Sequence, residues 1–190
     1  MVLVSELKAG TTIRLDDKLW RVLEVIRHAG SGQMQGFIEL KLKDLEFGHL
    51  SDRRFKTTDK VEEIELQKKQ MEYLYSTDTE CVFMDPETFE QASLPKTAVG
   101  KQEKFLSDGL KVMIELLNEI PVSIQFPKII EIKVASTGPG IKEAQDNTMK
   151  PAILENGIEL LVPQFIETGD KIRVDTEKIK YVDRVTIKRV

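Results

Sequence analysis

Short runs of alternating apolar and polar residues constrain the fold of this 190-residue chain more than any other feature. A period of two residues is typical of a β-strand that has one buried and one solvent-facing side. These runs are rich in β-branched residues and are separated by Gly, Asp, Pro and Asn. They cover residues 12–16, 20–26, 37–42, 129–134, 171–175 and 185–189. The only helix-like segment, 103–109, is long enough for one or two turns, so the sequence predicts an all-β fold.

A weak internal repeat divides this all-β chain into three units. An apolar residue, a glycine three positions later and a following apolar-x-apolar run recur around Gly10, Gly109 and Gly169. A glycine turn that tolerates positive φ and opens a strand explains the pattern, although any strand after a glycine turn would also match it. The uneven spacing excludes a solenoid. It favours three small barrels of roughly 60 residues (1–64, 65–127 and 128–190) that depend on contacts between barrels for stability.

The charge distribution bears on possible RNA contacts. The net charge of −4 does not match the basic excess that is usual in nucleic-acid-binding domains. The charge is uneven, however, with 11 basic and 11 acidic side chains in residues 1–64, 6 and 11 in 65–127, and 11 and 10 in 128–190. The first and third segments are therefore the better candidates for RNA contact.

Few residues suggest catalysis, metal binding or membrane insertion. His28 and His49 stand alone, and no catalytic triad or phosphate-binding loop is present, so neither an enzyme nor a cofactor is predicted. The only cysteine, Cys81, lies in an apolar run and is expected in a core, and one cysteine builds neither a disulfide nor a zinc site. No apolar run approaches the roughly 18 residues of a membrane span, and no signal peptide is evident. A cytoplasmic protein without membrane contact is expected.

Two loops are candidate binding sites. Residues 27–36 contain three glycines and no acidic side chain, and they are too many for a two-residue hairpin turn. Such a loop should project from its barrel, where Met34 would gain nothing without a partner, although an ordinary hairpin turn would look similar. In residues 137–151, Lys142 and Lys150 flank the amides of Gln145 and Asn147, which suits either RNA contact or a solvated loop.

Ordered segments along nearly the whole chain resemble bacterial translation elongation factor P. The opening run 7–16 resembles the first barrel strand of this family, and the most specific matches are Met71–Ser76 and Val82–Gln91. Further matches are 41–48, 54–56, 59–63, 139–142, 150–152, 162–166, 169–176 and 181–185.

The resemblance implies an L-shaped arrangement of three barrels, with an SH3-like or KOW-type barrel followed by two OB-fold barrels. It also implies a monomer that binds both ribosomal subunits between the peptidyl and exit sites. The hairpin of the first barrel would reach the acceptor end of peptidyl-tRNA and help ribosomes that stall on consecutive prolines. No protein side chain performs the chemistry in this family; positioning the peptidyl-tRNA lowers the entropic part of the barrier. The alternative is a diverged OB-barrel protein that binds another structured or single-stranded RNA.

The sequence departs from the family at both contact loops. The family hairpin has a tip Lys, or Arg in some branches, that is often enzymatically extended, whereas no Lys or Arg occurs here between His28 and Leu40. Counting from Gly10 places Gly32 at the tip and counting back from Phe37 places Gln33 there, so the hairpin is expected to be one residue longer and to lack a modification site. The third-barrel Gly-Asp-Thr element of the family is replaced by Glu143–Gln145.

These comparisons lead to specific site predictions. The tip residues expected to contact tRNA are Gly30, Ser31, Gly32, Gln33 and Met34, with Gln33 and Met34 carrying most of the contact. Secondary candidates for RNA contact are Arg27, His28, Lys142, Gln145, Asn147, Lys150, Tyr181 and Arg184. Side chains expected to pack or support the first barrel are Trp20, Leu23, Val25, Phe37, Leu40 and Leu42.

Overall fold

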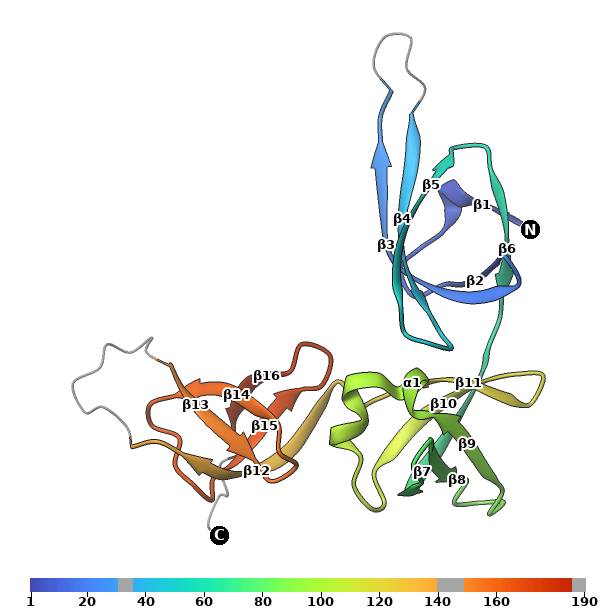
Figure 1. Cartoon of the computed structure of the whole chain (residues 1–190). Coiled ribbons are helices and arrows are strands. Elements are labelled where there is room, and N and C mark those ends of the chain that lie inside the picture. Colours follow the sequence, from blue (N-terminus) through green and yellow to red (C-terminus); the bar gives the residue numbers. More distant parts are fainter. Residues whose placement is uncertain (31–35, 140–148, 186–190) are drawn as a thin grey trace. The chain divides into compact units, whose positions relative to one another are not determined.

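The computed structural model describes residues 1–30, 36–139 and 149–185 and shows an all-β protein with three antiparallel sheets (Figure 1). The all-β fold class is therefore confirmed. The first sheet has the order β1-β6-β2-β3-β4-β5. Its strands are β1 (Val2–Leu3), β2 (Thr12–Leu15), β3 (Lys18–His28), β4 (Phe37–Asp44), β5 (Leu50–Lys56) and β6 (Lys60–Ile64). A short 3-10 helix, η1 (Val4–Glu6), follows β1.

The second and third sheets have five strands each, in the orders β11-β10-β7-β8-β9 and β14-β13-β12-β15-β16. The second contains β7 (Gln67–Ser76), β8 (Glu80–Met84), β9 (Gln91–Pro95), β10 (Lys111–Leu117) and β11 (Ile120–Gln125). The third contains β12 (Ile129–Thr137), β13 (Met149–Leu154), β14 (Glu159–Pro163), β15 (Lys171–Asp175) and β16 (Lys180–Arg184). Edge strands β9 and β11 contact each other, as do β14 and β16, so both sheets curl around their cores.

The helical segment lies earlier than the sequence predicts. The helix α1 (Lys96–Val99) leads directly into a 3-10 helix, η2 (Gly100–Phe105), whereas residues 103–109 were expected to be helical. Phe105 at the end of η2 is buried in the core of the third sheet.

The glycine repeat in the sequence corresponds to a structural repeat. Gly10 has a φ of 92°, its N–H donates to Val22 O at 2.7 Å, and Val22 N–H donates back to Thr11 O at 2.8 Å. The same reciprocal pair joins Gly109 (φ 74°) and Leu110 to Tyr73, and Gly169 (φ 94°) and Asp170 to Val134. Each glycine thus adopts a backbone conformation that other residues rarely adopt, and each turn is fixed to the strand beside it.

A β-bulge follows each of the three residues that are hydrogen-bonded to a glycine turn, which are Val22, Tyr73 and Val134. The strand register shifts between Val22 and Glu24, between Tyr73 and Tyr75, and between Val134 and Ser136. In the first sheet the bulge leaves Leu23 out of register, and its side chain is 44% exposed. The prediction that Leu23 packs in the barrel is therefore wrong. Trp20, Leu40 and Leu42 are buried as expected, and Val25 packs against the edge of this core.

A second repeat, which the sequence reasoning missed, closes one turn in each sheet. Asp44 Oδ1 accepts hydrogen bonds from the backbone N–H groups of the residues two and three positions later. Asp85 and Asp175 do the same in the other two sheets. All three carboxylates are buried, and these bonds keep them satisfied.

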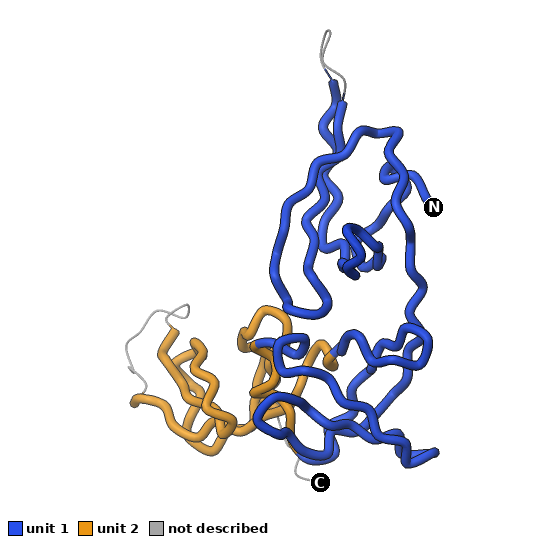
Figure 2. Tube along the Cα trace, turned by 45° about the vertical axis from the view of Figure 1, so that its right-hand side comes forward, with its two compact units in different colours: residues 1–100, 108–125 blue, residues 101–107, 126–190 orange. Residues whose placement is uncertain are grey.

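The chain divides into two compact units (Figure 2), which are residues 1–100 with 108–125 and residues 101–107 with 126–190. The first unit therefore holds the first and second sheets, and the second unit holds the third sheet and η2. The L-shaped arrangement and the domain boundaries at residues 64 and 127 stay predictions.

Candidate nucleic-acid interface

The β3–β4 hairpin carries the predicted tip, and its strands continue past the core of the first sheet (Figure 1). Val22 and Leu40 are fully buried where the hairpin covers the core. Farther along, the pairs are Ile26 with Glu39, Arg27 with Ile38 and His28 with Phe37. Arg27 and His28 are exposed, so the outer part of the hairpin presents polar groups to solvent.

Gly36 sets the width of the hairpin where the two strands meet the loop. A Cβ atom on Gly36 would lie 2.7 Å from His28 O and 3.1 Å from Gly30 N. Because both atoms belong to the backbone, a larger residue would force the strands apart. The sequence therefore needs glycine here for close packing of the two strands.

A stack of three side chains supports the hairpin at this position. The His28 and Phe37 rings are stacked, with centroids 4.3 Å apart and planes 16° apart. The Arg54 guanidinium from β5 lies over the Phe37 ring, 5.2 Å from its centroid, and its Nε is 3.1 Å from Glu39 Oε2. The ring is thus held between an imidazole and a cation, an arrangement that restricts motion of the hairpin base.

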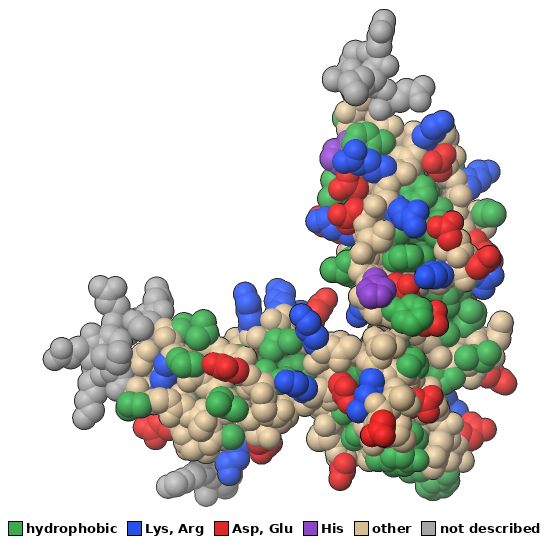
Figure 3. All heavy atoms as spheres, viewed as in Figure 1, with side chains coloured by type: hydrophobic (Ala, Val, Ile, Leu, Met, Phe, Trp, Pro, Cys, Tyr) green, Lys and Arg blue, Asp and Glu red, His purple; other side chains and the backbone are tan. Residues whose placement is uncertain are grey.

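Two exposed arginines near the hairpin supply positive charge. Arg27 donates from Nη2 to Ser5 O at 2.9 Å, and no ion pair to it is found among residues 1–30, 36–139 and 149–185. The side chain of Arg54 is 73% exposed. On the face shown in Figure 3, basic side chains of the first sheet are interspersed with acidic ones. The hairpin base therefore offers local cations without making the first sheet strongly basic overall.

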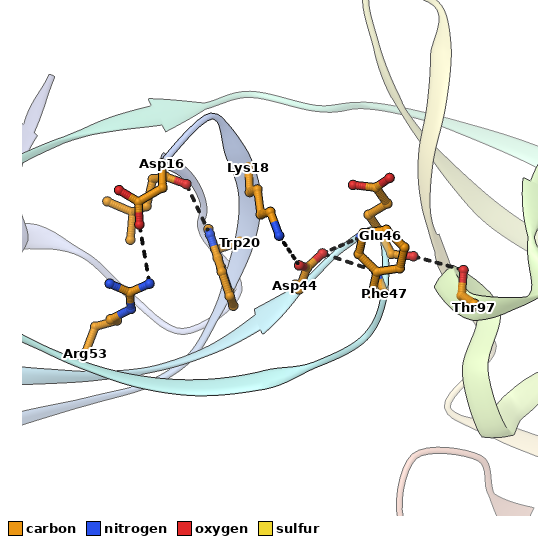
Figure 4. A network of polar contacts seen from close by, with 9 residues as sticks. Asp16, Lys18, Trp20, Asp44, Glu46, Phe47, Arg53 and Thr97 are labelled. Atoms are coloured by element: carbon orange, nitrogen blue, oxygen red, sulfur yellow. Dashed lines mark hydrogen bonds and ion pairs between the residues drawn. The ribbon is translucent and has the colours of Figure 1, made fainter.

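The opposite end of β4 is fixed by the Asp44 turn (Figure 4). Asp44 Oδ1 accepts from Glu46 N at 2.8 Å and Phe47 N at 3.2 Å, and Lys18 Nζ lies 4.0 Å from Oδ2. Thr97 Oγ1, at the start of α1, donates to Glu46 O at 3.2 Å. The end of β4 away from the hairpin loop is thus held within its own sheet, and the turn that follows it accepts a hydrogen bond from α1, which follows β9.

The described candidates in the third sheet all take part in local interactions. Lys150 is 7% exposed and donates from Nζ to Gly138 O at 2.8 Å. Tyr181 packs against the core, and burial raises the pKa of its phenol above the usual value near 10. Arg184 Nη1 lies 3.6 Å from Asp170 Oδ2, and its guanidinium lies 5.5 Å from the Phe165 ring centroid. RNA contact by these three residues stays a prediction, and Lys150 has a structural role.

Several predicted site residues lie outside the described residues. They are Ser31, Gly32, Gln33 and Met34 of the tip, and Lys142, Gln145 and Asn147 of the third-barrel loop. Arg27, His28 and Gly30 are described and lie together at the base of the hairpin loop. Sequence reasoning missed Arg54, whose only signal was its place in a segment that resembles the family.

Within the described parts of the chain, no group of three or more His, Cys, Asp or Glu side chains could hold a metal ion. None of the helices described is long and apolar enough to cross a membrane. The hairpin base instead offers an aromatic stack, cations and backbone groups, which suit contact with RNA.

Comparison with known proteins accounts for all three sheets. Family models match residues 3–61 as an elongation factor P KOW-like domain, 66–124 as an elongation factor P OB domain, and 130–184 as an elongation factor P C-terminal domain. A solved structure, the eukaryotic translation initiation factor 5A from Methanococcus jannaschii, covers 68% of this chain and 92% of its own. At a TM-score of 0.51 and 17% identity, it supports the fold alone.

Full-length relatives carry the same family name. Elongation factor P of Prochlorococcus marinus strain NATL1A is 34% identical over 187 residues, which cover 98% of this chain and 100% of the relative. Elongation factor P of Microcystis aeruginosa strain NIES-843 is 34% identical over 185 residues, which cover 97% and 100%. The chain therefore belongs to the elongation factor P family.

Proposed function

We propose that this protein binds the ribosome beside peptidyl-tRNA and stimulates peptide-bond formation at slow sequences such as consecutive prolines. Membership of a translation elongation factor family supports ribosome association. The observation that carries the finer proposal is the β3–β4 hairpin, which extends past its core and is supported by the His28–Phe37–Arg54 stack. We infer a cytoplasmic monomer that contacts both ribosomal subunits.

The proposed mechanism is positioning of a substrate rather than catalysis by a side chain. Proline reacts slowly partly because its ring fixes φ and its amine is secondary. A stiff hairpin that restricts the acceptor end of peptidyl-tRNA lowers the entropic part of the barrier, and the ribosomal RNA performs the reaction. The supported base of the hairpin serves this role, because a loosely held hairpin would lose the orientation that it supplies.

Binding is expected to depend on shape more than on charge. With a net charge of −4, the protein releases few counterions on RNA and should have low non-specific affinity. Co-sedimentation with ribosomes that carry peptidyl-tRNA should therefore be much stronger than binding to vacant ribosomes or bare RNA. Equal binding to all three would favour a general RNA-binding protein instead.

The tip is proposed to act without a modified cation. No Lys or Arg lies between His28 and Leu40, so Gln33 and Met34 are the side chains proposed to meet the tRNA. An amide offers two donors and one acceptor, and a thioether packs on a nucleobase without demanding fixed geometry. Unmodified recombinant protein should therefore be active.

Reconstituted translation of a message with consecutive prolines tests the tip. The variant Gln33→Ala/Met34→Ala should slow proline–proline bond formation by about tenfold, equivalent to about 1.4 kcal/mol of transition-state stabilisation. Its stability and ribosome co-sedimentation should be unchanged, and the control Gln67→Ala/Gln91→Ala, exposed on the second sheet, should match wild type. If the double variant is fully active, the tip contact is wrong and Arg27 and His28 become the candidates. Wild-type protein that works only after exposure to host extract would refute the unmodified tip.

A further inference from the structure

A buried ion pair joins the first and second sheets inside one compact unit. Arg21 on β3 donates from Nη2 to Glu115 Oε2 on β10, and from Nη1 to Gly10 O at 2.9 Å. The side chain of Glu115 is completely buried, and that of Arg21 is 16% exposed. One guanidinium thus binds the glycine turn of the first sheet and a carboxylate of the second.

Glu115 lies on the side of β10 that faces away from the core of its own sheet. Val112 and Ile114 are the inward residues of this strand, and alternation turns Glu115 outward. A carboxylate on an outer face is usually solvated, but here the first sheet covers it. Gln125 Nε2 donates to its other oxygen at 2.6 Å, and Lys68 Nζ lies 3.8 Å away, so the buried charge is fully partnered.

The ion pair is the buried charged contact among several that bring these two sheets together within the described residues. Only Glu65 and Leu66 connect β6 to β7, and a short linker limits distance but leaves rotation possible. The hydrogen bond from Thr97 to Glu46 O is a second contact and is exposed, and Leu45 lines the same hollow as Leu94 and Ala98. Arg21 lies on β3 itself, the strand that continues to His28, so its attachment to Glu115 orients the hairpin directly.

We propose that Arg21 and Glu115 are positioning residues, whose ion pair holds the β3–β4 hairpin in one fixed direction relative to the second sheet. The role in peptide-bond formation rests on the proposed function, whereas the fixed orientation does not. Because a displacement of about 1 Å can cost about a hundredfold in rate, loss of this orientation should slow the reaction even when the tip is intact.

The test combines an orientation measurement with an activity measurement on Glu115→Gln and Arg21→Lys. Glu115→Gln keeps the side-chain shape and removes the charge, and Arg21→Lys keeps the charge and removes the forked contact. The matched control is Glu24→Gln, which breaks the exposed Glu24–Lys41 pair (2.7 Å) on the same hairpin but touches nothing in the second sheet. Residual dipolar couplings of residues 2–64, and of 67–100 with 108–125, report the relative orientation of the two sheets, and amide spectra confirm that each sheet stays folded.

We expect one alignment tensor to fit both sheets in wild type and Glu24→Gln, and two different tensors to be needed for Glu115→Gln and Arg21→Lys. Glu115→Gln and Arg21→Lys should also slow proline–proline bond formation by about tenfold to a hundredfold, while Glu24→Gln stays at the wild-type rate. A single tensor in both Glu115→Gln and Arg21→Lys would overturn the fixed orientation. Two tensors with an unchanged rate would overturn the positioning role. Inactive wild-type protein would refute the proposed function, and the couplings would still decide the orientation.

Discussion

Replacing Phe37 with Ala removes the ring that lies between His28 and Arg54 at the base of the hairpin. A fully buried Phe costs about 3–5 kcal/mol when it is truncated to Ala. Phe37 is only half-buried, so about 100 Å² of apolar surface is affected. At about 25 cal/mol per Å² this gives about 2.5 kcal/mol, and no closed cavity adds to it. The expected loss in the free energy of unfolding is therefore about 2–3 kcal/mol.

Urea unfolding measured by the fluorescence of Trp20 checks this value. Trp20 is the only tryptophan and is buried in the same sheet, with its Nε1 donating to Leu15 O at 3.3 Å. Phe37→Leu should recover most of the lost stability because it restores apolar bulk without the stacked ring. Phe89→Ala, at a residue that is 70% exposed in the turn between β8 and β9, should change stability by less than about 0.5 kcal/mol. A loss below about 1 or above about 4 kcal/mol for Phe37→Ala would refute the half-buried packing.

Two further predictions concern a turn and a buried carboxylate. Gly169→Ala should lower the free energy of unfolding by about 1–2 kcal/mol through backbone strain alone, because φ is 94° and an added Cβ meets no atom within 4 Å. Gly138→Ala is the control. Equal free energies of unfolding for the two variants would contradict the strain. Hydrogen bonds, first from Lys69 and then from the backbone of Glu87, lower the pKa of Asp85 from 3.8 to about 2. The stability that ionised Asp85 contributes is therefore present above pH 4 and lost as the pH falls towards 2. Between pH 4 and pH 2, the urea midpoint of Asp85→Asn should fall less steeply with pH than that of wild type. The same dependence on pH in both proteins would refute the effect.

Five of the sixteen described strands were predictable because their pattern depends on local chemistry, while most of the predicted run 185–189 lies outside the described residues. Alternation of apolar and polar residues is required wherever one side of a strand faces water, and it located β2, β3, β4, β12 and β15. The glycine turns were also predictable, since a positive φ leaves a local mark in the sequence. Leu23 escaped prediction because a β-bulge reverses the side on which it points, and the bulge depends on a partner strand.

Contacts between distant segments were not predictable in this way. Arg21 and Glu115 are 94 positions apart, and each looks like an ordinary charge on an outer strand face. Lys150 reads as a loop cation in the sequence, yet it occupies an inward position of β13 and its amine is bound to Gly138 O. In both cases the role depends on which group of a distant segment lies opposite, a carboxylate for Arg21 and a carbonyl for Lys150, and a single sequence does not show this.

The residues that fix the path of the chain lie outside the hairpin loop, and this affects which substitutions the tip can accept. In all three sheets, a glycine turn bound to a bulged strand and an aspartate-capped turn fix the chain path, and none of these residues belongs to the hairpin loop. Among the described residues of the loop, Gly36 is a position whose size the backbone restricts, because an added Cβ atom would lie 2.7 Å from His28 O. We therefore expect the uncharged residues Gly32 and Gln33, predicted to stand where the family has its tip cation, to place no demand on the fold. The absence of Lys and Arg between His28 and Leu40 should accordingly affect what the hairpin binds and leave stability unchanged. Adding the cation back as Gln33→Lys should leave the urea midpoint within error of wild type and alter only activity; a shift in the midpoint would show that the tip and the fold are coupled after all.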